Sequence, residues 1–313
     1  MKSKYIITVD TETFKVNGRV LPFATHHYAD LPQGSFGTQR IMDICDHYGA
    51  KATFFVDVYM HRHYGESDVA SLCKRIDAAG HDVQLHAHTS WFPDARSGLI
   101  KDYSLPQQIE IIREGKDLLK KWLGKPPVGF RAGAYGANLD TIRALRENGF
   151  LVDSSYFPLH GNCDLNAQLQ KSPSNRMFSI EGIVELPVTT YWLLNAGKWR
   201  KNSKVDVNAC SWKELKNVVP KLASTSADYI ILFLHSFSFV DWDENGKNLS
   251  PKMKTLETFQ MLLEMVRGEL DGEFVTVADV ARTCGLQEAS TDGPVPSLPP
   301  FLFAPRLFNR FFG

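Results

Sequence analysis

The sequence predicts an α/β protein with a mostly parallel sheet, and three observations support this class. Short apolar runs alternate with amphipathic segments of helical period over nearly the whole chain, as in parallel strands joined by helices. The run at 229–234 is apolar throughout, as expected of a strand in a sheet that is covered on both faces. No internal repeat or linker interrupts the pattern, so a single domain is predicted over residues 1–287.

Apolar spacing and the position of Gly and Pro predict the individual elements. The clearest is a long helix over 105–123, which ends at Gly124 before a pair of prolines. Helices are predicted at 41–48, 69–76, 105–123, 139–145, 215–222 and 256–266. Strands are predicted at 6–12, 51–56, 82–86, 128–131, 150–153, 183–188, 229–235 and 274–277. Loops are predicted at 15–36, 157–178 and 191–211.

Composition excludes several classes of protein. With 35 Lys+Arg against 35 Asp+Glu, the charge favours neither nucleic acid nor an anionic membrane as a partner. No run of 18 apolar residues is present, so no transmembrane segment is predicted, and the N-terminal apolar run is too short for a signal peptide. Reduced thiols in a cytoplasmic protein are expected, because the five cysteines form no CxxC pair. They are Cys45, Cys73, Cys163, Cys210 and Cys284.

Residues 288–313 differ in character and are predicted to form an extended C-terminal tail. Residues 291–300 are rich in proline, and residues 301–313 carry five phenylalanines and two arginines. Such a segment could dock in a groove, pair with a second subunit or make peripheral contact with a membrane surface. Packing against its own domain is an equally good interpretation.

Two pairs of polar residues suggest a functional site. His86 and His88 lie two residues apart at the end of a predicted strand, so an extended backbone turns both imidazoles to one side. Asp10 and Glu12 have the same spacing at the end of the first strand. Two carboxylates and two imidazoles at the ends of two strands predict a metal site with an acid or base beside it.

Further polar residues follow other predicted strands, and the carboxyl ends of parallel strands are where function gathers. The strand-end set is Asp10, Glu12, His86, Arg131, Asp153 and His235. One carboxylate and two imidazoles can bind a divalent cation, and a second carboxylate can take a proton from its bound water. Arg131 can hold that carboxylate ionised, and His235 can protonate a leaving group.

Five stretches in this order resemble the NodB-type polysaccharide deacetylases of carbohydrate esterase family four. They are TVDTE at 8–12, GHDVQLHAHTSW at 80–91, GFRAGAYG at 129–136, GFLVDSSY at 149–156 and LFLHSF at 232–237. The strand KATFFV at 51–56 is also similar to one of that family, and the resemblance spans roughly residues 5–280.

The resemblance implies a distorted (β/α) barrel and the metal-dependent removal of an acyl group from a sugar. Asp10 matches the family's catalytic base, and Arg131 matches the arginine that orients it. Glu12 matches the metal carboxylate and His86 the first metal histidine. His235 matches the catalytic acid. The metal so implied is a divalent ion, expected to be zinc.

The sequence departs from the family pattern at three points. Ser90 occupies the position of the second metal histidine, so His88 is predicted to take that role, with Ser90 or water as the alternative. Glu12 is one methylene longer than the usual aspartate. The stretch RAGAYG lacks the family's paired prolines and shifts the tyrosine whose backbone would stabilise an oxyanion, here Tyr135.

The resulting hypothesis is a cytoplasmic, zinc-dependent deacetylase of an N-acetylated sugar in polysaccharide or lipopolysaccharide biosynthesis. Its carbohydrate substrate is expected to be a nucleotide- or lipid-linked precursor made inside the cell. A catalytically silent sugar-binding or assembly protein on the same fold is one alternative, which Ser90 supports. A metal-dependent hydrolase of a non-sugar amide is the other.

Individual residues also have simpler interpretations. Arg131 could pair with Asp153, and His235 could be a hydrogen-bonded core histidine. His26 and His27 are expected to be loop residues that could rim a cleft. Four aromatic residues could stack on sugar rings or pack in the core: Trp91, Phe92, Tyr191 and Trp192.

Overall fold

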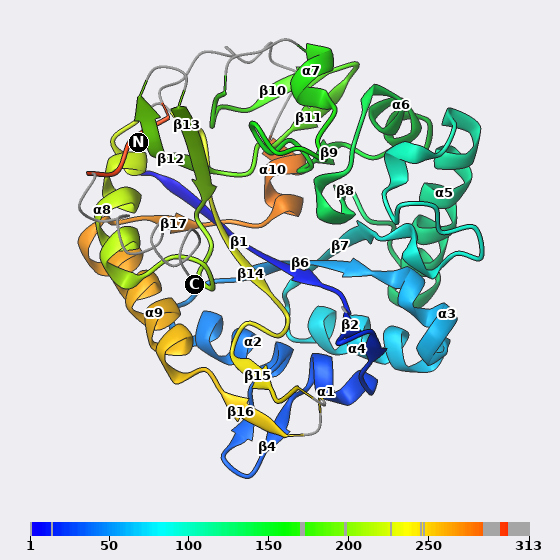
Figure 1. The fold of residues 1–313 in the computed structure, drawn as a ribbon, viewed down its shortest axis with the longest axis horizontal. Helices are drawn as coiled ribbons and strands as arrows, with labels where there is room; N and C mark the ends of the chain where they lie inside the picture. The colour runs from blue at the N-terminus through cyan, green and yellow to red at the C-terminus, as the bar shows by residue number, and fades with distance from the viewer. Residues whose placement is uncertain are drawn as a thin grey trace.

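In the computed structural model, one curled sheet forms an incomplete barrel with helices around its outside (Figure 1). The structure describes residues 2–13, 15–169, 173–196, 199–225, 227–244, 246, 248–283 and 295–299. In spatial order the strands are β10 (Phe178–Ile180), β11 (Ile183–Glu185), β9 (Val152–Asp153), β8 (Gly129–Ala132), β7 (Asp82–Ala87), β6 (Ala52–Asp57), β1 (Lys4–Thr11) and β14 (Ile230–His235). A short strand, β17 (Glu273–Phe274), also pairs with β1.

The central strands are parallel, which confirms the predicted α/β class and distorted barrel. Strand β1 lies between β6 and β14, and each of its residues from 7 to 10 has a partner on both sides. Every residue of β6 is buried, because the sheet is covered on both faces. Within this sheet only the pairing of β10 with β11 is antiparallel among the described strands.

Six long helices surround the sheet at the positions that apolar spacing predicts (Figure 1). They are α2 (Thr38–His47), α4 (Glu66–Ala78), α5 (Leu105–Leu123), α6 (Leu139–Glu147), α8 (Trp212–Ala223) and α9 (Met253–Glu264). Helix α5 has the predicted bounds, because Ser104 and Gln107 form a capping box at its start. Gly124 ends it in the left-handed conformation, with φ of 74°.

Shorter elements occupy the connections. The helices are α1 (Phe23–His27), α3 (His61–Tyr64), α7 (Leu165–Leu169), α10 (Val277–Thr283) and the single turns η1 (Val58–Met60), η2 (Thr89–Trp91), η3 (Ile100–Asp102), η4 (Gly133–Tyr135) and η5 (Met265–Glu269). Small antiparallel pairs join β2 (Lys15–Val16) to β3 (Arg19–Val20), β4 (Asp30–Leu31) to β5 (Gly34–Ser35), β12 (Thr190–Ala196) to β13 (Trp199–Lys204) and β15 (Val240–Trp242) to β16 (Leu249–Pro251).

Four sequence predictions of local structure were wrong. The predicted loop at 157–178 contains helix α7 and the first residue of β10. The predicted loop at 191–211 contains the β12–β13 hairpin, whose second strand is mostly polar and lacks the alternation that marks a strand. The predicted loop at 15–36 contains four short strands and α1. The predicted strand at 274–277 ends early, because Asp279 caps helix α10 by accepting hydrogen bonds from the backbone and side chain of Thr276 at 2.8 Å.

Part of the predicted tail is described. Residues 295–299 run beside β12, where the Trp192 amide donates to the carbonyl of Pro296 at 2.8 Å and Leu298 is buried. The phenylalanine-rich residues 301–313 lie outside the described residues. The division of the chain at residue 287 therefore stays a prediction.

Two composition-based expectations concern helices and thiols. Over the described ranges, no helix combines the length and apolarity that spanning a bilayer requires. Cys45, Cys73, Cys163 and Cys210 are buried free thiols, and Cys284 lies outside the described residues.

Candidate functional site

The parallel register gathers the predicted polar residues at the carboxyl edge of the sheet. Asp10 on β1 lies opposite His235 on β14. His86 on β7 lies opposite Asp57 on β6 and Arg131 on β8. Because all these strands point the same way, their terminal side chains meet above one edge.

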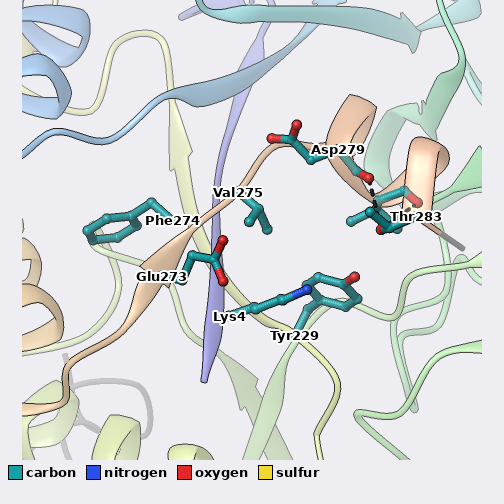
Figure 2. A pocket seen from close by; sticks show the side chains of 8 residues that line it. Lys4, Tyr229, Glu273, Phe274, Val275, Asp279 and Thr283 are labelled. Atoms are coloured by element: carbon teal, nitrogen blue, oxygen red, sulfur yellow. Dashed lines mark hydrogen bonds between the residues drawn. The ribbon is translucent and has the colours of Figure 1, made fainter. Parts of the chain in front are cut away.

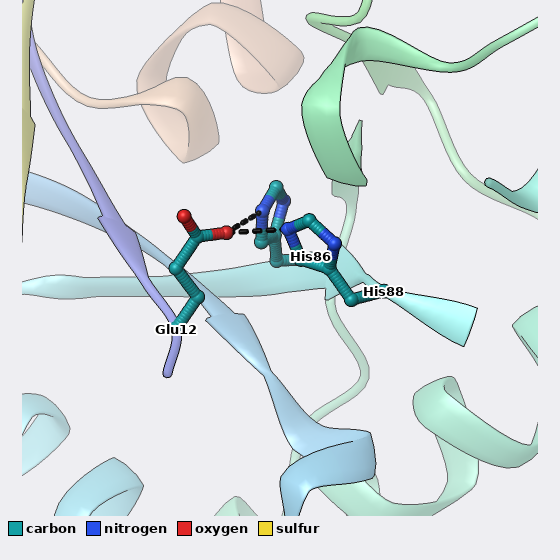
Figure 3. A group of neighbouring side chains, drawn as sticks. All are labelled: Glu12, His86 and His88. Atoms are coloured by element: carbon teal, nitrogen blue, oxygen red, sulfur yellow. Dashed lines mark hydrogen bonds and ion pairs between the residues drawn. The ribbon is translucent and has the colours of Figure 1, made fainter. Parts of the chain in front are cut away.

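Glu12, His86 and His88 form the centre of this group (Figure 3). The Glu12 Oε2 atom lies 3.0 Å from His86 Nε2 and 2.5 Å from His88 Nε2. Burial alone would disfavour charge on these groups, but their mutual attraction outweighs it. It holds the pKa of Glu12 well below its usual range and raises the pKa of His88 to about 9.

This donor set fits a divalent cation. The ligand atoms of the three residues lie within 4.8 Å of one another. His86 Nδ1 lies 2.8 Å from the carbonyl oxygen of Arg131 and must donate to it, which leaves a lone pair on Nε2. That lone pair faces a carboxylate oxygen, so the arrangement requires a proton or a metal ion between them. One carboxylate and two imidazoles with open positions are typical of catalytic zinc sites.

Asp10 and Arg131 form a buried ion pair beside these residues. Arg131 Nη1 donates to Asp10 Oδ1 at 2.7 Å and to Thr8 Oγ1 at 3.2 Å. Burial by itself raises the pKa of Asp10, but the charges of Arg131 and His86 lower it further than burial raises it. Asp10 is therefore kept ionised in a nearly dry environment, where it can accept a proton from a bound water.

Arg131 does not use Asp153 as its partner, contrary to the simpler interpretation. It donates instead to the Ser154 carbonyl at 3.2 Å, and its guanidinium lies 4.3 Å from the centre of the Phe55 ring. Asp153 accepts from Ser155 and shares a hydrogen bond with the buried carboxyl of Glu185. Burial and this neighbouring acid raise the pKa of Glu185 well above its usual range.

His235 lies on the other side of Glu12. Its Nε2 atom is 3.6 Å from Glu12 Oε1, and its ring stacks on Phe237 with the centroids 4.9 Å apart. Burial lowers the pKa of His235, and the nearby Lys204 ammonium lowers it further, against the attraction of Glu12. About a quarter of its side chain is exposed, at 25%, so it is not a sealed core histidine.

Ser90 lies apart from this group, since it is exposed and belongs to the turn η2 that follows His88. Glycine at position 133 explains how His88 reaches the site. A Cβ atom on Gly133 would lie 2.5 Å from His88 Nδ1, so any larger residue would collide with the ring. His88 thus occupies space that the RAGAYG stretch leaves open.

Three charged residues at the site were not predicted. Asp57 ends β6, is fully buried and accepts a hydrogen bond from the Trp91 indole at 2.7 Å. Burial raises the pKa of Asp57 to about 6. Its position directly after a predicted strand was a signal that the sequence did contain. Lys204 and Asp206 come from the hairpin region taken for a loop, so nothing in the local pattern marked them.

The remaining candidates lie mostly in the core. Tyr191 is fully buried, and Trp192 is 7% exposed, so neither forms a cleft mouth. Trp91 and Phe92 are half-buried. His26 and His27 are fully buried, and His27 Nε2 lies 3.1 Å from Thr13 Oγ1.

A separate hollow lies at the amino end of the sheet (Figure 2). Its volume is about 250 Å³, and its lining includes Lys4, Tyr229, Glu273 and Asp279. Lys4 and Asp10 are at opposite ends of β1, so this hollow is not part of the site.

Comparison with known proteins agrees with the resemblance seen in the sequence. Residues 27–152 match the family model for polysaccharide deacetylase. These residues are similar to that family, which agrees with the predicted resemblance to a divergent NodB-type protein.

Solved structures with a TM-score above 0.5 share the fold at low sequence identity. A Mycobacterium smegmatis protein assigned to the polysaccharide deacetylases is 17% identical, with a TM-score of 0.57 over 90% of this chain and 89% of its own. Puue allantoinase is 14% identical, with a TM-score of 0.54 over 89% of each chain. The Xyl-CE4 domain of a xylanase from the Trinervitermes trinervoides hindgut metagenome is 13% identical, with a TM-score of 0.48 over 93% of this chain and 95% of its own.

Proposed function

We propose that this protein is a metal-dependent hydrolase that removes the acyl group from an N-acetylated sugar. The observation that carries the proposal is the 2.7 Å ion pair of Asp10 with Arg131, immediately beside the cluster of Glu12, His86 and His88. A held, ionised base next to a set of metal ligands is the combination that hydrolysis of an amide requires.

In the proposed mechanism, Glu12, His86 and His88 hold a divalent cation, expected to be zinc. When bound, the cation supplies Lewis-acid polarisation of the acyl carbonyl and acidifies a water molecule. Asp10 accepts the proton of the attacking water, and the guanidinium of Arg131 keeps its carboxylate ionised and oriented.

His235 completes the proton transfers. In its protonated form it donates a proton to the nitrogen that leaves with the sugar. Its Nε2 atom lies 3.6 Å from Glu12 Oε1, whereas His88 contacts Glu12 Oε2, so the two imidazoles approach different oxygens of the carboxylate. Proton acceptance and proton donation are thereby assigned to separate residues, Asp10 and His235.

The proposed substrate is a nucleotide- or lipid-linked precursor of a surface polysaccharide or lipopolysaccharide, acted on in the cytoplasm. The four buried free thiols are compatible with this compartment. A cyclic amide of the kind named by allantoinase is the second candidate substrate class, supported by the shared fold alone.

The test begins with zinc content and hydrolysis of N-acetylated sugars and small cyclic amides by the wild-type protein. Asp10→Asn should abolish turnover but leave zinc bound, because Asp10 is not among the three ligands. His86→Ala should lose both zinc and turnover. Wild-type rates in Asp10→Asn would show that the base is assigned wrongly. A wild type that binds no metal would leave the silent sugar-binding protein as the better explanation.

A further inference from the structure

Lys204 places a cation at the site that the proposed mechanism does not use. It is the last residue of β13, and the segment after it pairs with β14: the Phe233 amide donates to the Val205 carbonyl at 2.9 Å. Phe233 precedes His235 by two residues, and their rings are 4.8 Å apart. The lysine therefore lies next to the strand that carries the proposed acid.

The ammonium of Lys204 has three N–H donors, and the protein supplies a partner for each. Its Nζ atom lies 2.9 Å from the Tyr135 hydroxyl, 3.5 Å from Asp206 Oδ2 and 3.1 Å from the centre of the Phe233 ring. The side chains of Lys204 and Asp206 are only 16% and 8% exposed. Lys204 thus has no donor left to bind a ligand directly.

The contact with Lys204 determines whether the Tyr135 hydroxyl acts as a hydrogen-bond donor or acceptor toward other groups. An ammonium has no lone pair, so the lysine donates and the hydroxyl accepts. The proton of the hydroxyl must then point elsewhere. In the described part of the chain it meets no protein acceptor within hydrogen-bond distance. Burial and the charge of Asp10 raise the pKa of Tyr135 well above its usual range, so this proton stays in place.

Tyr135 is also held in an unusual backbone conformation. Ala134 and Tyr135 have φ of 47° and 59°, two successive non-glycine residues in the left-handed region. The Tyr135 ring packs against Phe157 and His160, with centroid distances of 5.1 and 5.5 Å. Buried charge pairs contribute little net stability, so the Lys204–Asp206 pair is better explained by a role in positioning Tyr135.

We propose that the Tyr135 hydroxyl, oriented and polarised by Lys204, donates a hydrogen bond to a hydroxyl of the acylated sugar. In this proposal, which rests on the proposed function, Tyr135 determines sugar specificity and Lys204 is a positioning residue that acts through it. The sugar side of the bond is assigned because the Tyr135 ring lies 6.5 Å from that of Phe233, whose ring is 4.8 Å from that of His235, the residue proposed to protonate the leaving nitrogen of the sugar.

Steady-state kinetics on N-acetylglucosamine oligosaccharides tests the proposed roles of Tyr135 and Lys204. Tyr135→Phe keeps the ring and removes only the hydroxyl, and Lys204→Met keeps the alkyl stem. Tyr135→Phe should raise KM about tenfold with kcat within about twofold, since the bond is present in both ground and transition states. Lys204→Met should raise KM by a similar factor, whereas its kcat can also change because the Lys204 ammonium lowers the pKa of His235. The double variant should show no further loss, and Lys204→Arg should restore KM. Zinc content should be unchanged throughout, because neither residue contacts Glu12, His86 or His88.

Three results would overturn the proposed roles of Tyr135 and Lys204: an unchanged KM in Tyr135→Phe, a fall in kcat alone in Tyr135→Phe, or effects on KM that multiply in the double variant. If Lys204→Met fails to fold, Lys204→Met with Asp206→Asn replaces it, since this removes both charges. If the wild type hydrolyses no acyl sugar, the proposed function fails separately. Calorimetric titration of wild type and Tyr135→Phe with the same oligosaccharides then tests whether the Tyr135 hydroxyl binds the sugar. Equal affinity of the two proteins, or no binding, would overturn the proposed roles of Tyr135 and Lys204.

Discussion

The clearest test of His88 as a metal ligand is Gly133→Ala. The added methyl group would lie 2.5 Å from His88 Nδ1 and 2.7 Å from the carbonyl oxygen of Ala87. Contacts between such atoms are normally near 3.5 Å, so something must move by roughly 1 Å. Ala87 is paired with Ala132 in the sheet, so its carbonyl cannot move freely. The backbone at position 133 must therefore move away from that carbonyl, and the imidazole of His88, which the methyl group also contacts, must shift as well.

A shift of that size breaks coordination, because zinc–nitrogen bonds are about 2.0 Å long. We expect Gly133→Ala to weaken zinc binding by at least about 10- to 100-fold, the range found for disturbing a ligand's support. Overpacking should also lower the free energy of unfolding by about 1–3 kcal/mol. Competition with a chromogenic chelator measures the affinity, and urea unfolding of the metal-free protein measures the stability.

The matched control is Gly136→Ala in the same loop. Its methyl group would lie 2.9 Å from Cβ and Cδ2 of Leu99, so Leu99 must shift, but the three atoms nearest to it all belong to Leu99 and its φ of −79° suits alanine. The control should keep the zinc affinity of the wild type. Equal zinc affinity in Gly133→Ala and the wild type would refute the assignment of His88. Equal losses in both variants would indicate a general disturbance of the loop instead.

Three further predictions concern metal, pH and packing. Zinc at 100 times its dissociation constant should stabilise the wild type by about 2.7 kcal/mol, and a melting temperature unchanged by zinc in the wild type would contradict a site in the native protein. Burial lowers the pKa of His27 from 6.5 to about 3, so the unfolded state takes up the proton first. The free energy of unfolding therefore falls as pH drops below 6.5. In urea unfolding between pH 7 and 5, the wild type should lose about 2 kcal/mol more of it than His27→Gln, and parallel plots of stability against pH for the two proteins would disprove this. Trp91→Phe should lower the free energy of unfolding of the metal-free protein by about 1–3 kcal/mol, because the buried carboxylate of Asp57 loses the indole N–H as a hydrogen-bond donor. An unchanged midpoint of urea unfolding would rule this out.

The sequence contained enough information for the centre of the site because its geometry is local. Asp10 and Glu12 lie two residues apart, as do His86 and His88, and each pair is fixed by one strand. The parallel alternation of strands and helices then implies that these strand ends meet. Asp57 obeys the same rule, as a carboxylate that follows an apolar strand, and it could have been found in the same way.

Other features depend on contacts between distant parts of the chain. Lys204 reaches the site only because the segment after β13 pairs with Phe233, and the polar sequence of β13 does not indicate that pairing. The strand-end rule also selected Asp153, whose carboxyl pairs with Glu185 instead of Arg131. The strand-end rule predicts at which edge of the sheet a side chain lies. It does not predict which neighbouring side chain it contacts, because this depends on how the sheet curls.

The position of β1 has a consequence for biosynthesis. This strand is made first, yet one of its two long partners, β14, is made near the end of the chain, and Asp10 faces His235 across that late pairing. The proposed base and acid can therefore come together only after most of the protein has left the ribosome. Until then β1 has an open edge of buried apolar residues, which exposes the nascent chain to aggregation. Truncation before β14 should thus abolish folding even though the three proposed metal ligands would all be present.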